Sequence, residues 1–194
     1  MTSILKADNI QNASGSNLIN ESGSVVTIGA NGNNIVIPVG ATITNSGTQV
    51  GFGGANTPNF KVRTSSSISV GAAASTKVIW NIEDWDTDNS FASSTFTVPS
   101  DKAGKYVFFA SNEILGSISG RTSQLRFYLN GVNQPHATYN VTTWGTAAVT
   151  IIGSYSANLS VSDTVEIYIY SDNDAGKTTG TTNNTYWYGY KIIE

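Results

Sequence analysis

Apolar and polar residues alternate along several short runs of the chain. Between Leu125 and Asn130 the apolar positions are Leu125, Phe127 and Leu129, and between Thr164 and Tyr170 they are Val165, Ile167 and Ile169. A period of two is that of a strand with one buried face and one wet face. Asn130-Gly131 follows the first run and favours the positive φ angles of a tight hairpin turn. The pattern therefore predicts two strands, the first of which ends in a hairpin.

Two other runs are apolar on both faces. Lys105 to Ala110 contains Tyr106, Val107, Phe108 and Phe109 in succession. In Tyr186 to Ile193, one face holds Tyr186, Tyr188, Tyr190 and Ile192, and the other holds Trp187, Gly189, Lys191 and Ile193. A second subunit that covers one sheet is one interpretation, because a monomer would leave that face in water. Exposed tyrosines on a monomer are the other interpretation.

The composition favours an all-β chain with a single packed core. Charged residues make up 12% of the 194 residues, and Gly, Ser, Thr and Asn separate the short β-branched and aromatic runs. Helices use more Glu, Lys and Ala on their exposed faces, so hardly any helix is expected. Turn clusters between short strands are typical of a sandwich or barrel. We predict an antiparallel β-sandwich over residues 59–194.

Residues 1–50 differ from the rest and form a separate segment rich in Gly, Ser and Asn. The pairs Ser14-Gly15 and Ser22-Gly23 each precede a short apolar step, which hints at a repeat of small β-turns. Such a segment cannot bury its apolar residues alone, so we expect either a short intertwined shaft or an arm that becomes ordered on a partner. Residues 51–58 contain three Gly and one Pro and are predicted to be the linker.

Several function classes are disfavoured by charge and composition. The net charge is −3 and the pI is near 5.0, with Lys and Arg scattered, so a nucleic-acid partner is not expected. No run approaches the roughly 20 apolar residues of a membrane span, so membrane insertion is not expected. The first residues show no charged start followed by an apolar run, so no export signal is predicted. With no Cys and one His, a cofactor or thiolate metal site is not expected either.

Candidate metal chemistry is confined to an acidic run. Asp84, Asp86 and Asp88 alternate as calcium-loop ligands do, but Asn89 stands where the sharp-turn Gly belongs and Thr95 where the bidentate Glu belongs. We favour a solvated acidic loop and keep calcium as the weaker alternative. No catalytic residue is predicted, because no Ser or Asp stands at a triad spacing from His136.

A candidate ligand-binding loop spans residues 135–147. His136, Tyr139 and Trp144 are interleaved there with Asn and Thr, and aromatics beside small polar groups can bind a sugar. The alternative is that Tyr139 and Trp144 belong to the core or to a trimer interface. A second loop, residues 172–184, is predicted to be exposed.

Several motifs occur in the order found in one jelly-roll family. They are Asn81, Trp85, Phe91 and Phe96, then Gly104-Lys105-Tyr106-Val107-Phe108, Asp163-Thr164-Val165 and Tyr188-Gly189-Tyr190-Lys191-Ile192. Together they resemble the globular heads of the complement q subcomponent and the tumour-necrosis-factor jelly roll. The spacing from Asn81 to the aromatic differs by one residue, the segment before Gly104 is longer than usual, and Ser162 replaces a Gly.

The resemblance implies a homotrimer with one sheet facing the three-fold axis. Carried over, Tyr106 and Phe108 would be core, and the trimer interface would contain Val107, Phe109, Tyr155, Trp187 and Ile193. Thr-Phe-Thr-Val-Pro before Gly104, together with the Asn-rich start, resembles bacteriophage virion fibres or spikes.

This resemblance implies a structural protein at the virion surface and not an enzyme. Residues 1–50 would bind another virion protein, and the head would bind a host surface glycan or protein as part of a tail fibre or spike. A capsid-attached head fibre or decoration protein is the alternative, and a surface-polysaccharide depolymerase comes last.

Overall fold

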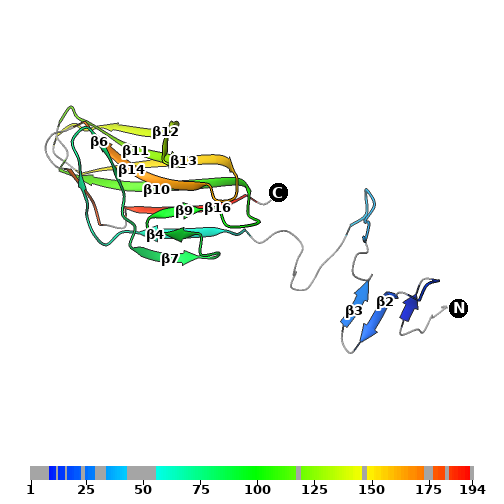
Figure 1. Ribbon diagram of the computed structural model, residues 1–194. Coiled ribbons are helices and arrows are strands. Elements are labelled where there is room, and N and C mark those ends of the chain that lie inside the picture. The colour runs from blue at the N-terminus through cyan, green and yellow to red at the C-terminus, as the bar shows by residue number, and fades with distance from the viewer. Residues whose placement is uncertain are drawn as a thin grey trace. The chain divides into compact units, whose positions relative to one another are not determined.

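The chain divides into two compact units, Met1–Val50 and Gly51–Glu194. The computed structural model describes residues 9–11, 13–15, 17–22, 25–28, 34–42, 56–116, 119–145, 148–172, 177–181 and 184–192. In the first unit, three strands form an antiparallel sheet in the order β1-β2-β3 (Figure 1): β1 (Asn9–Gln11), β2 (Asn17–Ser22) and β3 (Val25–Ile28). No helix in the described part of the chain is long and apolar enough to span a membrane.

The second unit is a sandwich of two antiparallel sheets (Figure 1), as the sequence predicted. The larger sheet has the order β5-β15-β10-β16-β4-β7, with β13 paired to β10: β4 (Asn59–Arg63), β5 (Ser69–Val70), β7 (Ile82–Asp86), β10 (Gly104–Leu115), β13 (Val149–Leu159), β15 (Lys177–Thr179) and β16 (Tyr186–Lys191). The smaller sheet has the order β12-β11-β14-β9-β8: β8 (Phe91–Ala92), β9 (Thr95–Thr97), β11 (Thr122–Leu129), β12 (Val132–Thr142) and β14 (Thr164–Ser171). The short strand β6 (Ala74–Lys77) precedes Val78, whose N–H binds the Ile167 carbonyl of β14.

The core lies between the two sheets and is built from alternate residues of each strand. In β14, Val165, Ile167 and Ile169 are buried and their neighbours are partly exposed, which confirms the predicted alternation. The larger sheet adds a group of aromatic side chains that pack on one another: Phe60, Tyr106, Phe108 and Trp187, with Phe96 from β9. Tyr106 and Phe108 are thus core residues, as the resemblance implied.

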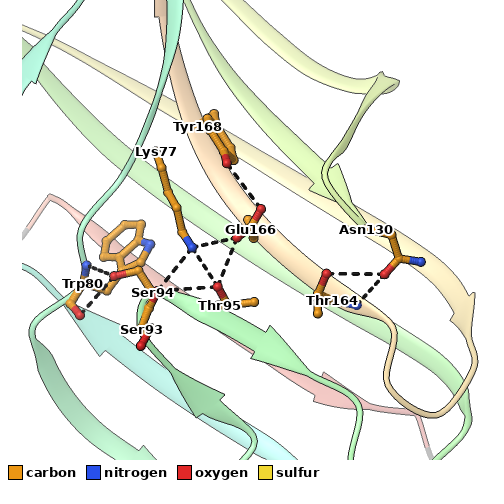
Figure 2. Close-up of polar contacts among 9 residues, drawn as sticks. All are labelled: Lys77, Trp80, Ser93, Ser94, Thr95, Asn130, Thr164, Glu166 and Tyr168. Carbon is orange, nitrogen blue, oxygen red and sulfur yellow. Dashed lines mark hydrogen bonds and ion pairs between the residues drawn. The ribbon is translucent and has the colours of Figure 1, made fainter.

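The hairpin between β11 and β12 has the predicted turn. Asn130 and Gly131 have φ angles of 50° and 75°. The Asn130 side chain accepts a hydrogen bond from the Thr164 N–H at 2.8 Å and donates one to Asp163 at 2.8 Å. These bonds fix the hairpin to the start of β14, and Figure 2 shows the contact between Asn130 and Thr164.

Polar contacts fasten the short strands to the outer side of β14. Figure 2 shows Lys77 Nζ donating to Glu166 Oε1 at 2.6 Å, to Thr95 Oγ1 at 2.7 Å and to the Ser93 carbonyl at 3.2 Å. Burial on its own would raise the pKa of Glu166, but the hydrogen bond and charge of Lys77, aided by Thr95 and Tyr168, hold that pKa below its ordinary value. Three segments that are distant in sequence therefore meet at one ammonium group.

Three predicted loops need correction, because part of each forms a strand. The acidic run begins inside β7, and residues 177–179 of the second loop form β15, where Thr179 is fully buried. The loop predicted around His136 is part of β12, which is an edge strand that pairs, among the described strands, with β11 alone. An edge strand tolerates Pro135, and the register shift opposite Phe127 accommodates the residues around it.

Candidate recognition surface on the larger sheet

The outer face of the larger sheet carries aromatic side chains on neighbouring strands. We call this the aromatic face: Val107, Phe109, Tyr186, Tyr188 and Tyr190. Phe109 lies opposite Tyr188 and stacks on it with ring centroids 5.1 Å apart, and Tyr188 stacks on Tyr186 at 6.2 Å. All five residues remain partly exposed in the single chain. The face is therefore a partly exposed surface on which apolar and tyrosine side chains lie side by side.

A β-bulge between β4 and β7 widens this surface toward the edge of the sheet. Lys61 pairs with Trp85 and Val62 pairs with Glu83, so Asp84 is the extra residue. A bulge interrupts the alternation of side chains between the two faces of a sheet and changes the direction of the side chains at the bulge. Here Asp84 and the next residue, Trp85, both line the same hollow on the outer side.

This Trp85 hollow has a volume of about 600 Å³ and combines charged and aromatic walls: Lys61, Arg63, Asp84, Trp85, Tyr186 and Tyr188. Arg63 donates hydrogen bonds to the Asp84 carboxylate, from Nε at 2.9 and 3.0 Å and from Nη2 at 2.7 Å. Lys61 Nζ lies 3.4 Å from the same carboxylate and 5.4 Å from the Trp85 ring centroid. Hydrogen bonds from Arg63 hold the pKa of Asp84 below its ordinary value, and Lys61 adds to the effect.

A second hollow, of about 320 Å³, lies beside β12 and β13. This His136 hollow is lined by Val107, Phe109, His136, Ala137, Tyr139, Ser154, Tyr155 and Ser156. The His136 ring lies 5.7 Å from the Tyr155 ring, and the Tyr139 hydroxyl donates to the Ser154 carbonyl on the free edge of β13. The hollow joins the predicted ligand-binding residues His136 and Tyr139 to one end of the aromatic face.

Trp144 does not belong to either hollow. Its side chain is 87% exposed and follows the end of β12, so the structure separates it from His136 and Tyr139. The three residues predicted as one ligand-binding loop therefore do not form a single site.

The single chain places two of the residues predicted for the trimer interface on its outer surface and contradicts the outward placement of two others. Val107 and Phe109 point outward, whereas Tyr155 and Trp187 are buried in the core of the single chain, at 4% and 0% exposure. Trp187 packs edge-on against Phe60 with centroids 4.9 Å apart. Ile193 lies outside the described residues.

In β16 the structure reverses the two faces. The predicted interface contained Trp187 and Ile193, which implied that the alternate residues point inward. The residues that point outward are instead Tyr186, Tyr188 and Tyr190. Burial raises the pKa of Tyr188, and the neighbouring Tyr186 and Tyr190 raise it further.

The three aspartates of the calcium candidate have separate partners. Asp84 binds Arg63 and Lys61, Asp86 accepts hydrogen bonds from Ser90 Oγ and the Phe91 N–H, and Asp88 lies 3.4 Å from Lys102 Nζ. In the described part of the chain, no three His, Asp or Glu residues come together as a metal site.

Comparison with solved structures identifies the fold. The chain is similar to murine APRIL (TM-score 0.53, 12% identity, 69% of this chain and 98% of that chain) and to Eiger TNF from S. frugiperda (TM-score 0.50, 12% identity, 69% and 90%). The globular domain of zebrafish complement 1qA protein also matches (TM-score 0.49, 16% identity, 70% and 97%). No protein-family model and no curated protein matches the sequence. The second unit has a jelly-roll fold like that of Eiger TNF and murine APRIL.

Sequence reasoning missed the Trp85 hollow. Lys61 and Arg63 alternate with buried Phe60 and Val62 in β4, and this pattern places both cations on one face. It does not reveal that Asp84 joins them, because that contact depends on the bulge.

Proposed function

We propose that this chain is a non-enzymatic attachment protein that assembles as a homotrimer through the aromatic face. The observation that carries the proposal is the outward stack of Phe109 on Tyr188, flanked by Val107 and two further tyrosines. A contiguous apolar surface of this kind marks an interaction site. The jelly-roll fold supports a trimer, which is the assembly that the complement/tumour-necrosis-factor resemblance implies.

The first unit supports a role as an anchor. Its described residues leave several large apolar side chains exposed, namely Val26, Ile28, Ile35, Val36 and Val39. A three-stranded sheet of this size has little core of its own, so other copies or another protein would have to cover these side chains. With the fibre-like sequence of the first 50 residues, this favours a bacteriophage virion protein whose head binds a host surface component.

The assembly is tested by light scattering and native mass spectrometry at fixed protein concentration. We expect a trimer for the wild type and a folded monomer for Phe109→Arg, because the new charge would lie on an outward position of β10. The matched control is Trp144→Arg, which places the same charge on an exposed residue away from this face. A monodisperse wild-type monomer, or a Phe109→Arg variant that remains trimeric, would refute the trimer.

The biological role is tested on intact particles. Immunogold labelling should place the protein on the tail, and the purified full chain should block adsorption of the phage to its host. Labelling on the capsid would instead favour a head fibre or decoration protein. A trimer that neither binds host cells nor blocks adsorption would count against attachment.

A further inference from the structure

Trp85 is the exposed tryptophan of the larger sheet. It is 47% exposed on β7, the last strand of that sheet, whereas Trp187 and Trp80 are buried. A tryptophan ring offers a large rigid contact area at low conformational cost. Tyr186 and Tyr188 line the same hollow, so a ligand there meets three aromatic side chains.

The polar groups of the Trp85 hollow are fixed in position before any ligand binds. Arg63 holds Asp84 through Nε and Nη2, and no hydrogen bond to another described residue involves its Nη1 group. The forked geometry of an arginine–carboxylate pair sets the direction of the remaining donors and acceptors. The hollow thus presents oriented N–H donors and a carboxylate acceptor, which lowers the ordering cost of binding.

These two features together match one class of small ligand. A pyranose ring has a face of C–H groups, which packs on the electron-rich face of an aromatic ring, and a rim of hydroxyls that both donate and accept. An aliphatic ligand would displace water from the remaining N–H donors of Lys61 and Arg63 without replacing its hydrogen bonds, and that is costly in a partly desolvated site. The volume of about 600 Å³ lies within the range of small-molecule sites and holds one or two sugar rings.

We propose that the Trp85 hollow binds a pyranose residue of a surface polysaccharide, with the sugar face on Trp85 and its hydroxyls on Arg63 and Asp84. The biological meaning of this site rests on the proposed attachment function, but sugar binding itself is measurable without it. The site shares Tyr186 and Tyr188 with the aromatic face, whereas Trp85, Arg63 and Asp84 lie on β7 and β4, toward the edge of the sheet. The proposal therefore requires a trimer contact that is centred on β10 and leaves this edge of the sheet open.

The test uses the full chain and saturation-transfer difference NMR with the methyl glycosides of glucose, galactose, N-acetylglucosamine and glucuronic acid, followed by a bacterial glycan array. We expect ring C–H signals from at least one glycoside or array ligand. Trp85→Ala should weaken that binding at least tenfold, and Trp144→Ala, which removes an even more exposed tryptophan, should leave it unchanged. Arg63→Lys keeps the charge but loses the fork, and should weaken binding without loss of the trimer.

Three outcomes would overturn the sugar site. They are the absence of binding to every probe, wild-type affinity in Trp85→Ala, and loss of binding in Trp144→Ala. Light scattering on each variant separates loss of the site from loss of assembly. If a trimer that binds no sugar blocks phage adsorption, the sugar site is overturned and the attachment function stands. If a trimer that binds sugar does not block adsorption, the sugar site stands and the attachment function is contradicted.

Discussion

Gly189 is the position where one added methyl group should disturb the core most directly. It lies on β16 opposite Phe108 of β10 and Phe60 of β4. A Cβ atom there would stand 2.3 Å from Phe108 Cδ1, 2.8 Å from Phe108 Cε1 and 3.1 Å from Phe60 Cε1. Ordinary carbon contacts are about 3.5–4.0 Å, so the Phe108 ring would have to move by more than 1 Å.

The Phe108 ring has little room to move. It is fully buried, stacks on Tyr106 and Tyr155, and contacts Phe96 and Trp187. Overpacking of this kind costs about 1–3 kcal/mol. Replacing Gly by Ala in a strand by itself raises the free energy of unfolding by about 0.5–1 kcal/mol, because Ala loses less conformational entropy on folding. Because the Phe108 ring must move by more than 1 Å within a packed core, the cost of overpacking should lie near the upper end of its range, about 3 kcal/mol. We therefore expect Gly189→Ala to lower the free energy of unfolding by about 2 kcal/mol.

Urea denaturation at one fixed protein concentration measures this change, since oligomerisation makes stability depend on concentration. With a urea dependence of about 2 kcal/mol/M, the midpoint should fall by about 1 M. Gly71→Ala is the control, because its new Cβ meets Ala74 Cβ at 3.5 Å and Thr76 Oγ1 at 3.8 Å, which is ordinary contact. Phe108→Leu in the Gly189→Ala background should recover part of the loss. A Gly189→Ala variant as stable as the wild type would refute the packing argument.

Three further predictions concern single side chains. Trp187→Arg should abolish the folded state, seen by circular dichroism, because it buries an unpaired charge in the core. Tyr139→Phe should cost about 0.5–1.5 kcal/mol in urea, since it removes the hydrogen bond to the Ser154 carbonyl. Glu166, whose pKa is lowered, stabilises the fold above its unfolded pKa of about 4.3 and loses this effect as pH falls through its folded value. The gap in urea midpoint between wild type and Glu166→Gln should therefore shrink between about pH 5 and pH 3, and a constant gap would contradict this.

The strands whose two faces differ in polarity were predictable from sequence. In β11 and β14, three apolar residues alternate with residues that are polar or tyrosine, so one register alone buries the apolar set. The turn at Asn130-Gly131 was equally clear, because few residue pairs adopt two positive φ angles.

The inward face of β16 was not predictable in this way, because both of its faces are apolar. One face carries three tyrosines and the other carries Trp187 and Gly189, so hydrophobicity alone does not show which face is buried. The structure resolves the choice by fit: Gly189 leaves space for Phe108, and Trp187 fills the gap beside Phe60 and Phe91. The tyrosines on the other face stay partly exposed in the single chain.

The Trp85 hollow needed information that no single segment carries. Its walls come from β4, β7 and β16, and the β7 contribution depends on a bulge that shifts Asp84 beside Arg63 and Lys61. In the sequence, the same aspartate belongs to an acidic run that resembles a broken calcium loop. In the structure, two cations of β4 pair with the Asp84 carboxylate, and in the proposed site this pairing sets the direction of the donors around it. The bulge therefore converts an acidic run into one wall of a mixed aromatic and polar site, and that conversion is what the proposed sugar recognition requires.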